Sequence, residues 1–179
     1  MSLILQTLYL ILPAYLGNAS ATLSGRWKFL NTPLDHGQKI NSDFILGPNK
    51  TYRGTLICLI VALLTVWLQY LLYPTAFFQK ISLIDYGQIA WPILGILAGI
   101  GTAGGDILAS FIKRRLSIKI TGPMPVLDQL DFVVGFLALT VALIDYTWPT
   151  IITALILTVI IHPLSNVIAY KLKLKKVWW

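Results

Sequence analysis

Five long apolar stretches do most to limit what this chain can form. They run over about 2–23, 55–73, 89–112, 132–144 and 148–170 of its 179 residues. A helix that crosses about 30 Å of hydrocarbon needs roughly 20 mostly apolar residues. The composition agrees, because 56% of the residues are hydrophobic, only 12% are charged and the mean hydropathy is +0.75. We therefore predict an all-α polytopic membrane protein with five transmembrane helices.

These stretches use nearly the whole sequence, so residues 1–179 are expected to form a single integral-membrane domain, with a homodimer left open. The N-terminal stretch lacks the basic region and the cleavage site of a secretory signal, and we treat it as part of the fold. The single cysteine, Cys58, lies inside the second stretch. It has no second cysteine for an internal disulfide and is expected to pack within the membrane.

The positive charges indicate an orientation. Thirteen of the fourteen Lys and Arg residues follow the first, third or fifth stretch, and Lys80 is the exception. The positive-inside rule then places the N-terminus outside and the C-terminus in the cytoplasm. Lys171, Lys173, Lys175 and Lys176 are expected mainly to set this topology, with Trp178 and Trp179 at the interface. We expect a multi-pass protein of the cell membrane.

The net charge of +7 also bears on partners. The cations border apolar helices and lack the interleaved aromatic residues of a soluble nucleic-acid module, so no nucleic acid is expected. Anionic membrane lipids and phosphate groups on the cytoplasmic side fit this pattern better.

Aspartates occur at membrane depth. Asp106 precedes Lys113 by seven residues, about 10 Å along a helix, and a carboxylate there is costly unless it faces a cavity, a cation or a metal. Asp128 and Asp131 are three apart, so both carboxylates share a helical face suited to one cation. From Asp131 to Asp145 a helix covers only about 20 Å, so its first end should dip into the protein. Ordinary acids that complement a helix dipole are the alternative for this pair.

Other polar and small residues accompany these aspartates. Ser110 follows Asp106 by one helical turn and shares its face. His162 and Asn166 are four apart in the last stretch, either hydrogen-bonded to other helices or part of a site. The glycine runs 95–99 and 101–105 are expected to pack helices, although glycines beside Asp106 could instead open space for a ligand.

The connection 24–53 is long for a helix bundle and contains Leu46-Gly-Pro-Asn-Lys-Thr-Tyr-Arg-Gly54. This run is not a Walker A sequence, because the required spacing is missing. Alone it is weak evidence. Together with the membrane-depth aspartates and a second basic cluster on the same face, it predicts a metal and polyphosphate site between cytosol and bilayer.

On these motifs the chain resembles the CDP-archaeol synthase family and, more distantly, the phosphatidate cytidylyltransferases. The segments that carry the resemblance are Leu12-Pro-Ala-Tyr-Leu-Gly-Asn18, Asp35-His-Gly-Gln-Lys39, the 47–54 run, Gly105-Asp-Ile-Leu-Ala-Ser-Phe-Ile-Lys-Arg-Arg115 and Pro125-Val-Leu-Asp-Gln-Leu-Asp131. Relative to the phosphatidate enzymes, Ile120 replaces a usual acid, Gln129 replaces a usual arginine and a His-Gly-Gly stretch is absent. These departures favour the archaeol branch.

The resemblance implies that a lipid phosphate attacks the α-phosphate of CTP, which releases pyrophosphate and leaves a CDP-lipid. Mg²⁺ would be held by Asp106, Asp128 and Asp131, with Asp106 also among the catalytic residues. The cations expected to hold the triphosphate and the lipid phosphate are Lys50, Arg53, Lys113, Arg114 and Lys119. The other substrate-binding candidates are Asn18, Asn49, Thr51, Ser110, Arg115, His162 and Asn166. No general base is needed, because a phosphate monoester with a second pKa of about 6 is already anionic.

Three alternatives stay open at this point. The lipid could be phosphatidate, which would give CDP-diacylglycerol. The chain could be another Mg²⁺-dependent transferase acting on a polyprenyl phosphate. A non-enzymatic transporter with Asp106 and His162 along an ion path is less favoured, because transporters often contain related halves and five helices show no such repeat.

Overall fold

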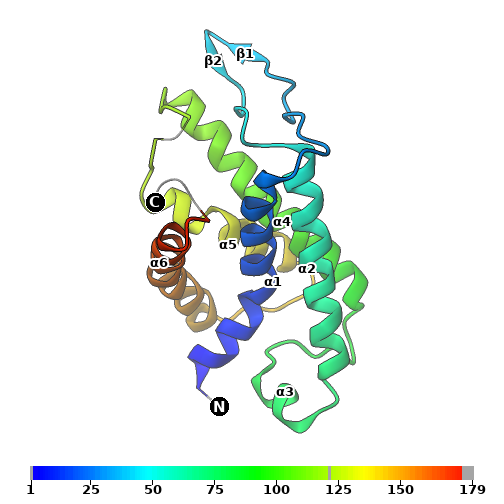
Figure 1. Ribbon diagram of the computed structural model, residues 1–179. Coiled ribbons are helices and arrows are strands. Elements are labelled where there is room, and N and C mark those ends of the chain that lie inside the picture. Colours follow the sequence, from blue (N-terminus) through cyan, green and yellow to red (C-terminus); the bar gives the residue numbers. More distant parts are fainter. Residues whose placement is uncertain (1, 121, 175–179) are drawn as a thin grey trace.

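The computed structural model describes residues 2–120 and 122–174. Figure 1 shows a bundle of long helices with a small β-hairpin at one end, here called the loop end, and the short helix α3 at the other. The helical elements are α1 (Leu3–Leu23), η1 (Ser24–Arg26), α2 (Tyr52–Leu72), α3 (Ala76–Ile81), α4 (Trp91–Arg115), α5 (Leu127–Thr140) and α6 (Trp148–Lys171). The strands are β1 (Lys39–Ile40) and β2 (Asp43–Phe44), paired antiparallel. The predicted roles of Lys175, Lys176, Trp178 and Trp179 fall outside the described residues.

Among the described residues, four helices are long and apolar enough to cross a membrane, namely α1 with η1, α2, α4 and α6. They match four of the five apolar stretches closely. The fourth apolar stretch corresponds to α5, which has 14 residues, about 21 Å of helix, and begins at Leu127, ahead of the minimum range 132–144. It ends at Thr140, short of the expected residue 144, because the chain turns there before α6. The short length expected for this element is confirmed, whereas its crossing of the bilayer stays a prediction.

The first helical turns are set by capping residues. The Thr51 side chain accepts a hydrogen bond from the Gly54 N–H and caps α2, and Thr147 caps α6 in the same way through Thr150. Proline occupies the first turn of α4 and of α6, where its missing N–H costs nothing. The cap at Thr51 fixes the end of the long loop and therefore where Lys50 stands relative to α2.

α4 is the central helix and packs against both α2 and α5. On the α2 side, a Cβ added at Gly99 would lie 2.9 Å from the Cα of Leu59, so glycine permits this close contact. The buried core lies between α1, α4 and α5 and includes Leu10, Leu94 and Phe132. The central position of α4 places its polar residues where three other helices can reach them.

The contact between α4 and α5 depends on glycine on both helices. A Cβ at Gly105 would overlap the backbone carbonyl oxygen of Asp131, and Gly101 and Gly135 meet each other in the same way. The expectation that glycines in the 101–105 run pack helices is therefore confirmed for Gly101 and Gly105. Gly104 differs, because a Cβ there would meet nothing within 4 Å. The close crossing brings the first turns of α5 beside Asp106.

Candidate active site

Two adjoining cavities lie toward the loop end of the bundle. The first, of about 470 Å³, is bounded by α1, α2, α4 and the long loop. The second, of about 270 Å³, extends from the same loop across α4 to α5 and α6. Both cavities are lined by Asn18, Thr22, Asn49, Lys50 and Asp106. The two spaces therefore meet at one group of polar residues.

The centre of this group is an ion pair. The Lys50 Nζ lies 2.6 Å from each carboxylate oxygen of Asp106, and the two side chains are 20% and 33% exposed. Lys50 comes from the loop just before α2, whereas Asp106 lies inside α4. The pair closes the loop onto the central helix, yet both side chains keep access to the cavities. The Asp106 carboxylate, costly at this depth if alone, is compensated by the lysine.

A second ion pair joins the end of α4 to the start of α5. The Lys113 Nζ lies 2.9 Å from each carboxylate oxygen of Asp128, and Asp128 also accepts a hydrogen bond from the Met124 N–H at 2.8 Å. Asp131, one turn further along α5, accepts a 2.6 Å hydrogen bond from the Phe132 N–H. Both aspartates, with Asp106, line the second cavity. The three carboxylates therefore line one cavity, as the sequence predicted.

These carboxylates do not form a preassembled metal cage. Within residues 2–120 and 122–174, no three His, Cys, Asp or Glu side chains are grouped closely enough to ligate one ion. Mg²⁺ commonly uses one or two carboxylates, together with water and substrate phosphate oxygens, rather than an all-protein cage. Carboxylates that line a polar cavity beside cationic side chains suit an ion that arrives with a polyphosphate. The donor set therefore fits magnesium shared with a substrate.

Two buried arginines border the cavities. Arg53, 4% exposed, donates from Nη1 to the carbonyl oxygens of Trp27 and Phe29 and lines the first cavity. Arg114, 6% exposed, donates to the Lys119 carbonyl oxygen at 3.3 Å and lines the second. The Nε of each has no hydrogen-bond partner among the described residues. Each arginine thus shapes a loop and retains an unused N–H donor.

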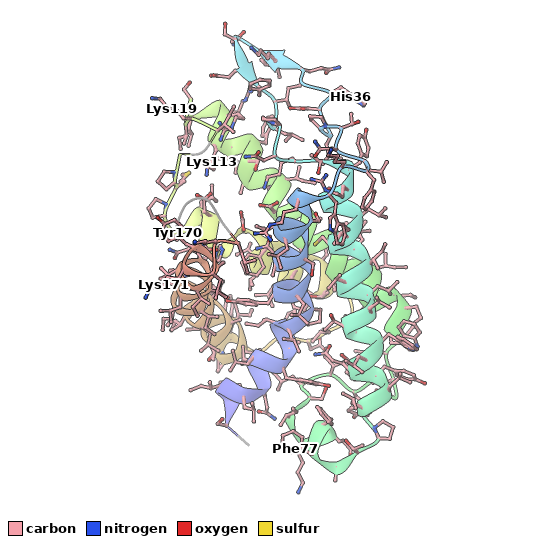
Figure 2. All side chains as sticks on the ribbon, in the orientation of Figure 1. His36, Phe77, Lys113, Lys119, Tyr170 and Lys171 are labelled. Carbon is pink, nitrogen blue, oxygen red and sulfur yellow. The ribbon has the colours of Figure 1, made fainter. Side chains whose placement is uncertain are left out.

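Most of the predicted site residues come together, although they belong to five separate segments. Asn18, Asn49, Thr51, Ser110, His162 and Asn166 line one or both cavities with the charged residues above. Arg115 and Lys119 are not among the lining residues. The Arg115 guanidinium donates to the Phe44 carbonyl oxygen at 2.7 Å and stacks over the Phe111 ring, so it holds the hairpin instead. Figure 2 shows Lys113, Lys119 and His36 toward the same end of the molecule, opposite Phe77.

The cavities also contain residues that the sequence reasoning missed. Thr22 follows Asn18 by four residues, and Thr102 precedes Asp106 by four, so each shares the helical face of a predicted residue. That spacing was an available signal. The buried hydroxyl of Thr102 has no hydrogen-bond partner in the described part of the chain. Asn31 lies in the long loop, where no periodic pattern could have identified it.

Asp35, the first residue of the Asp35-His-Gly-Gln-Lys39 motif, has a structural function in the loop. Its carboxylate accepts hydrogen bonds from the N–H groups of Gly37, Leu46 and Gly47 at 2.8–3.0 Å. These contacts join the two arms of the loop just before Lys50. Burial of the carboxyl group opposes ionisation, but the N–H donors outweigh it and hold the pKa of Asp35 below its usual 3.8. A negative charge at this point stabilises the loop.

The lowered pKa predicts how stability depends on pH. Since the folded-state pKa lies below the unfolded one, the stabilising contribution is present above about pH 4 and is lost as pH falls through the folded pKa. Asp35→Asn should lower the free energy of unfolding near pH 7 by about 1–3 kcal/mol. As the pH falls below 4, the free energy of unfolding of this variant should decrease less than that of the wild type, because asparagine has no carboxyl group to protonate. Thermal unfolding from pH 7 to 3 measures both. The matched control is Asp43→Asn, in the same long loop. An equal response of both variants would contradict this function of Asp35.

Arg53 gives a second prediction. Lysine has no planar fork, so Arg53→Lys should lose the two carbonyl contacts that hold Trp27 and Phe29 and shift the start of α2. We expect turnover to fall by about tenfold or more, since misplacement of about 1 Å can cost on the order of 100-fold. Steady-state rates measure this. Lys28→Ala, an exposed change in the same loop, is the control; equal rates for the two variants would make Arg53 an ordinary topology charge.

The family model described as CarS-like, CDP-archaeol synthase, matches residues 1–179. The CDP-archaeol synthase of Methanocaldococcus jannaschii is 40% identical over 179 residues, covering 99% of this chain and 98% of that protein. The CDP-archaeol synthase of Methanococcus maripaludis strain C7 is 37% identical over 178 residues, covering 99% and 97%. The similarity therefore extends over the full length of both relatives.

A solved structure is also similar. It is the structure of an intramembrane enzyme for archaeal membrane lipids biosynthesis. The two chains superpose with a TM-score of 0.76 and are 29% identical. The match covers 91% of this chain and 94% of that one. Most of this chain thus has a structural counterpart in a protein described as an intramembrane enzyme.

Proposed function

Because this chain belongs to the CDP-archaeol synthase family, we propose that its two joined cavities bind CTP and an archaetidic acid-type lipid phosphate side by side. The chain is a membrane nucleotidyltransferase, a CTP-dependent lipid cytidylyltransferase of archaeal phospholipid biosynthesis. The products are a CDP-lipid of the CDP-archaeol type and pyrophosphate. The roles of individual residues in binding and catalysis are part of this proposal.

One observation carries the residue assignment. Asp106, Asp128 and Asp131 line the same cavity as Lys50, Lys113 and Arg114. A triphosphate that carries a divalent cation needs both signs of charge within a few ångströms, carboxylates for the ion and cations for the phosphate oxygens. Neither a purely basic nor a purely acidic cavity would meet that need. The mixed lining supports a site for a metal–nucleotide complex.

Magnesium is the metal we propose, with Asp106, Asp128 and Asp131 as its candidate ligands, one or two of them at a time, and phosphate oxygens of the nucleotide as further ligands. When bound, it neutralises charge on the triphosphate and helps to align it for attack. Asp106 and Asp128 are now paired with Lys50 and Lys113. Phosphate oxygens that enter the cavity would draw these lysines toward themselves and leave the carboxylates available as ligands. The two ion pairs thus keep the charges compensated until the nucleotide arrives.

The reaction itself is an in-line displacement at phosphorus. An oxygen of the lipid phosphate forms a bond to the α-phosphorus of CTP, the bond from that phosphorus to the α,β-bridging oxygen breaks, and pyrophosphate leaves with the electron pair. Lys50, Lys113 and Arg114 hold and neutralise the reacting phosphates. Arg53 borders the first cavity, where its unused Nε can orient a substrate oxygen. No residue has to remove a proton, because the attacking phosphate is already anionic.

The membrane arrangement is also part of the proposal. The start of α5 is joined to the end of α4 at the loop end by Lys113 and Asp128. Beyond its other end, Ile144 belongs to the same buried cluster as Ile84 and Tyr86 in the connection between α3 and α4. α5 thus carries the chain back across the bundle, as a fifth, short span would. With the cations at the loop end, we propose N-terminus outside, C-terminus inside and an active site that faces the cytoplasm.

A nucleotide and lipid panel tests the proposed reaction. Purified protein with Mg²⁺ should release pyrophosphate from CTP only when a lipid phosphate is present, and ATP, GTP and UTP should give little product. Isoprenoid ether-linked and acyl ester-linked lipid phosphates, tested side by side with CTP and dCTP, identify the substrate. Turnover with another nucleotide, and none with CTP, would refute the assignment. Crosslinking in membranes tests for a homodimer, which stays a hypothesis.

A further inference from the structure

A third cavity, of about 700 Å³, is a groove between α4 and α5. Apart from Asp131, its lining is apolar or glycine. On α4 it extends from Ile100 to Ile112, and on the other side it is lined by the turn at 124–126 and by α5 as far as Leu139. Leu108, Val126 and Val134, along its rim, are 59%, 56% and 48% exposed. In a bilayer such a rim faces hydrocarbon, so the groove is open to lipid.

Gly104 gives the groove its depth. A Cβ at this position would meet no heavy atom within 4 Å, although the next residue, Gly105, touches the Asp131 carbonyl oxygen. Gly101 and Gly105 are therefore explained by helix packing and Gly104 is not. A larger side chain at Gly104 would extend into open groove without pushing α4 and α5 apart.

The groove adjoins the active site through one residue. Asp131 lines both the groove and the second cavity, where Lys113, Arg114 and Asp128 are gathered. A lipid whose phosphate lies in the second cavity can therefore extend an apolar chain past Asp131 into the groove between α4 and α5. From the groove the chain can continue into the bilayer. Of the three cavities described here, the groove is the one with a predominantly apolar lining.

We propose that the groove between α4 and α5 holds a hydrocarbon chain of the lipid phosphate substrate, and that Gly104 sets the room for that chain beside the reacting phosphate. The inference rests on the proposed function and deepens it. Moving a chain from bilayer hydrocarbon into an apolar groove brings little hydrophobic gain, because both surroundings are apolar. The groove therefore acts by orientation: a chain seated there fixes the direction from which the phosphate oxygen approaches CTP.

Gly104→Leu tests the inference. The leucine fills the groove, so kcat/KM for a lipid phosphate with long isoprenoid chains should fall by about tenfold or more, since a shift of about 1 Å can cost on the order of 100-fold. A short-chain lipid phosphate, which barely enters the groove, should be turned over at close to the wild-type rate. CTP binding, measured without lipid, should not change. Val134→Trp fills the groove from α5 and should give the same chain-length dependence if Gly104→Leu does not fold.

Ile96→Trp is the matched control. It adds bulk to a lipid-facing position of α4 that is 48% exposed and lies about two turns before Gly104, outside the groove. This variant should match the wild type with both lipids. Wild-type rates for Gly104→Leu and Val134→Trp with the long-chain lipid, or equal losses with both lipids, would overturn the groove assignment. The absence of pyrophosphate release by the wild-type protein with every lipid phosphate would instead overturn the proposed function.

Discussion

Replacing Asp131 with asparagine is expected to lower turnover by on the order of 1,000-fold while the protein stays folded. Asparagine has nearly the same shape and can still accept the hydrogen bond from the Phe132 N–H, so α5 should keep its start. The variant lacks the negatively charged carboxylate that we propose as a ligand of magnesium beside the nucleotide. Pyrophosphate release at saturating CTP and lipid measures the loss, and thermal unfolding shows that the fold is kept.

Two further substitutions sharpen this prediction. Asp128→Asn should cause a loss of similar size, although it also weakens the ion pair with Lys113 and so the contact between α4 and α5. Asp43→Asn, in the hairpin and away from the cavities, should leave turnover nearly unchanged. Near-normal rates for both the Asp128 and the Asp131 variants would remove these residues from the metal site.

Lys50→Met should cause the second large loss, a fall of about 100- to 1,000-fold in kcat/KM for CTP. Lys50 is the only side chain for which the structure gives an ion pair with Asp106 within the described residues. Methionine retains a similar length but provides neither charge nor N–H donors for phosphate. Steady-state kinetics with CTP varied at fixed lipid measures the effect.

A double-mutant cycle with Asp106→Asn shows whether the pair acts as a unit. If Lys50 and Asp106 serve the same bound nucleotide, the double variant should be much less impaired than the product of the single losses predicts. Lys39→Met, in the hairpin where its Nζ lies over the Phe44 ring, is the control and should keep wild-type kinetics. Equal kinetics for the Lys50 and Lys39 variants would show that Lys50 only sets topology.

Much of the bundle could be predicted from local pattern. Long apolar runs indicate helices whatever their neighbours are, and α1, α2, α4 and α6 begin and end within a few residues of the predicted stretches. The carboxylates could be expected to lie together for a similar reason, and they line one cavity. An acid at membrane depth is so costly that Asp106 had to face something polar, and Asp128 and Asp131 were three apart beside a helix too short to leave them outside.

The contacts at the loop end of the bundle could not be predicted in this way. The position of Asp35 depends on N–H groups two to twelve residues away, and that of Arg115 depends on a carbonyl oxygen 71 residues away. Such contacts leave no periodic trace in the sequence. Arg115 and Lys119 were predicted to bind substrate beside Lys113. Instead the Arg115 guanidinium at the end of α4 donates to the Phe44 carbonyl oxygen, and Lys119 lies beyond the end of α4.

The most direct test of the central claim follows the phosphorus atoms of CTP. With Mg²⁺ and an isoprenoid lipid phosphate, a label on the α-phosphorus should appear in the lipid product, and a label on the γ-phosphorus should appear in released pyrophosphate. The two should form in equal amounts, and both should form on the order of 1,000-fold more slowly with Asp131→Asn. A γ-label transferred to the lipid, or CTP hydrolysed with no label in the lipid, would contradict a cytidylyl transfer at this site.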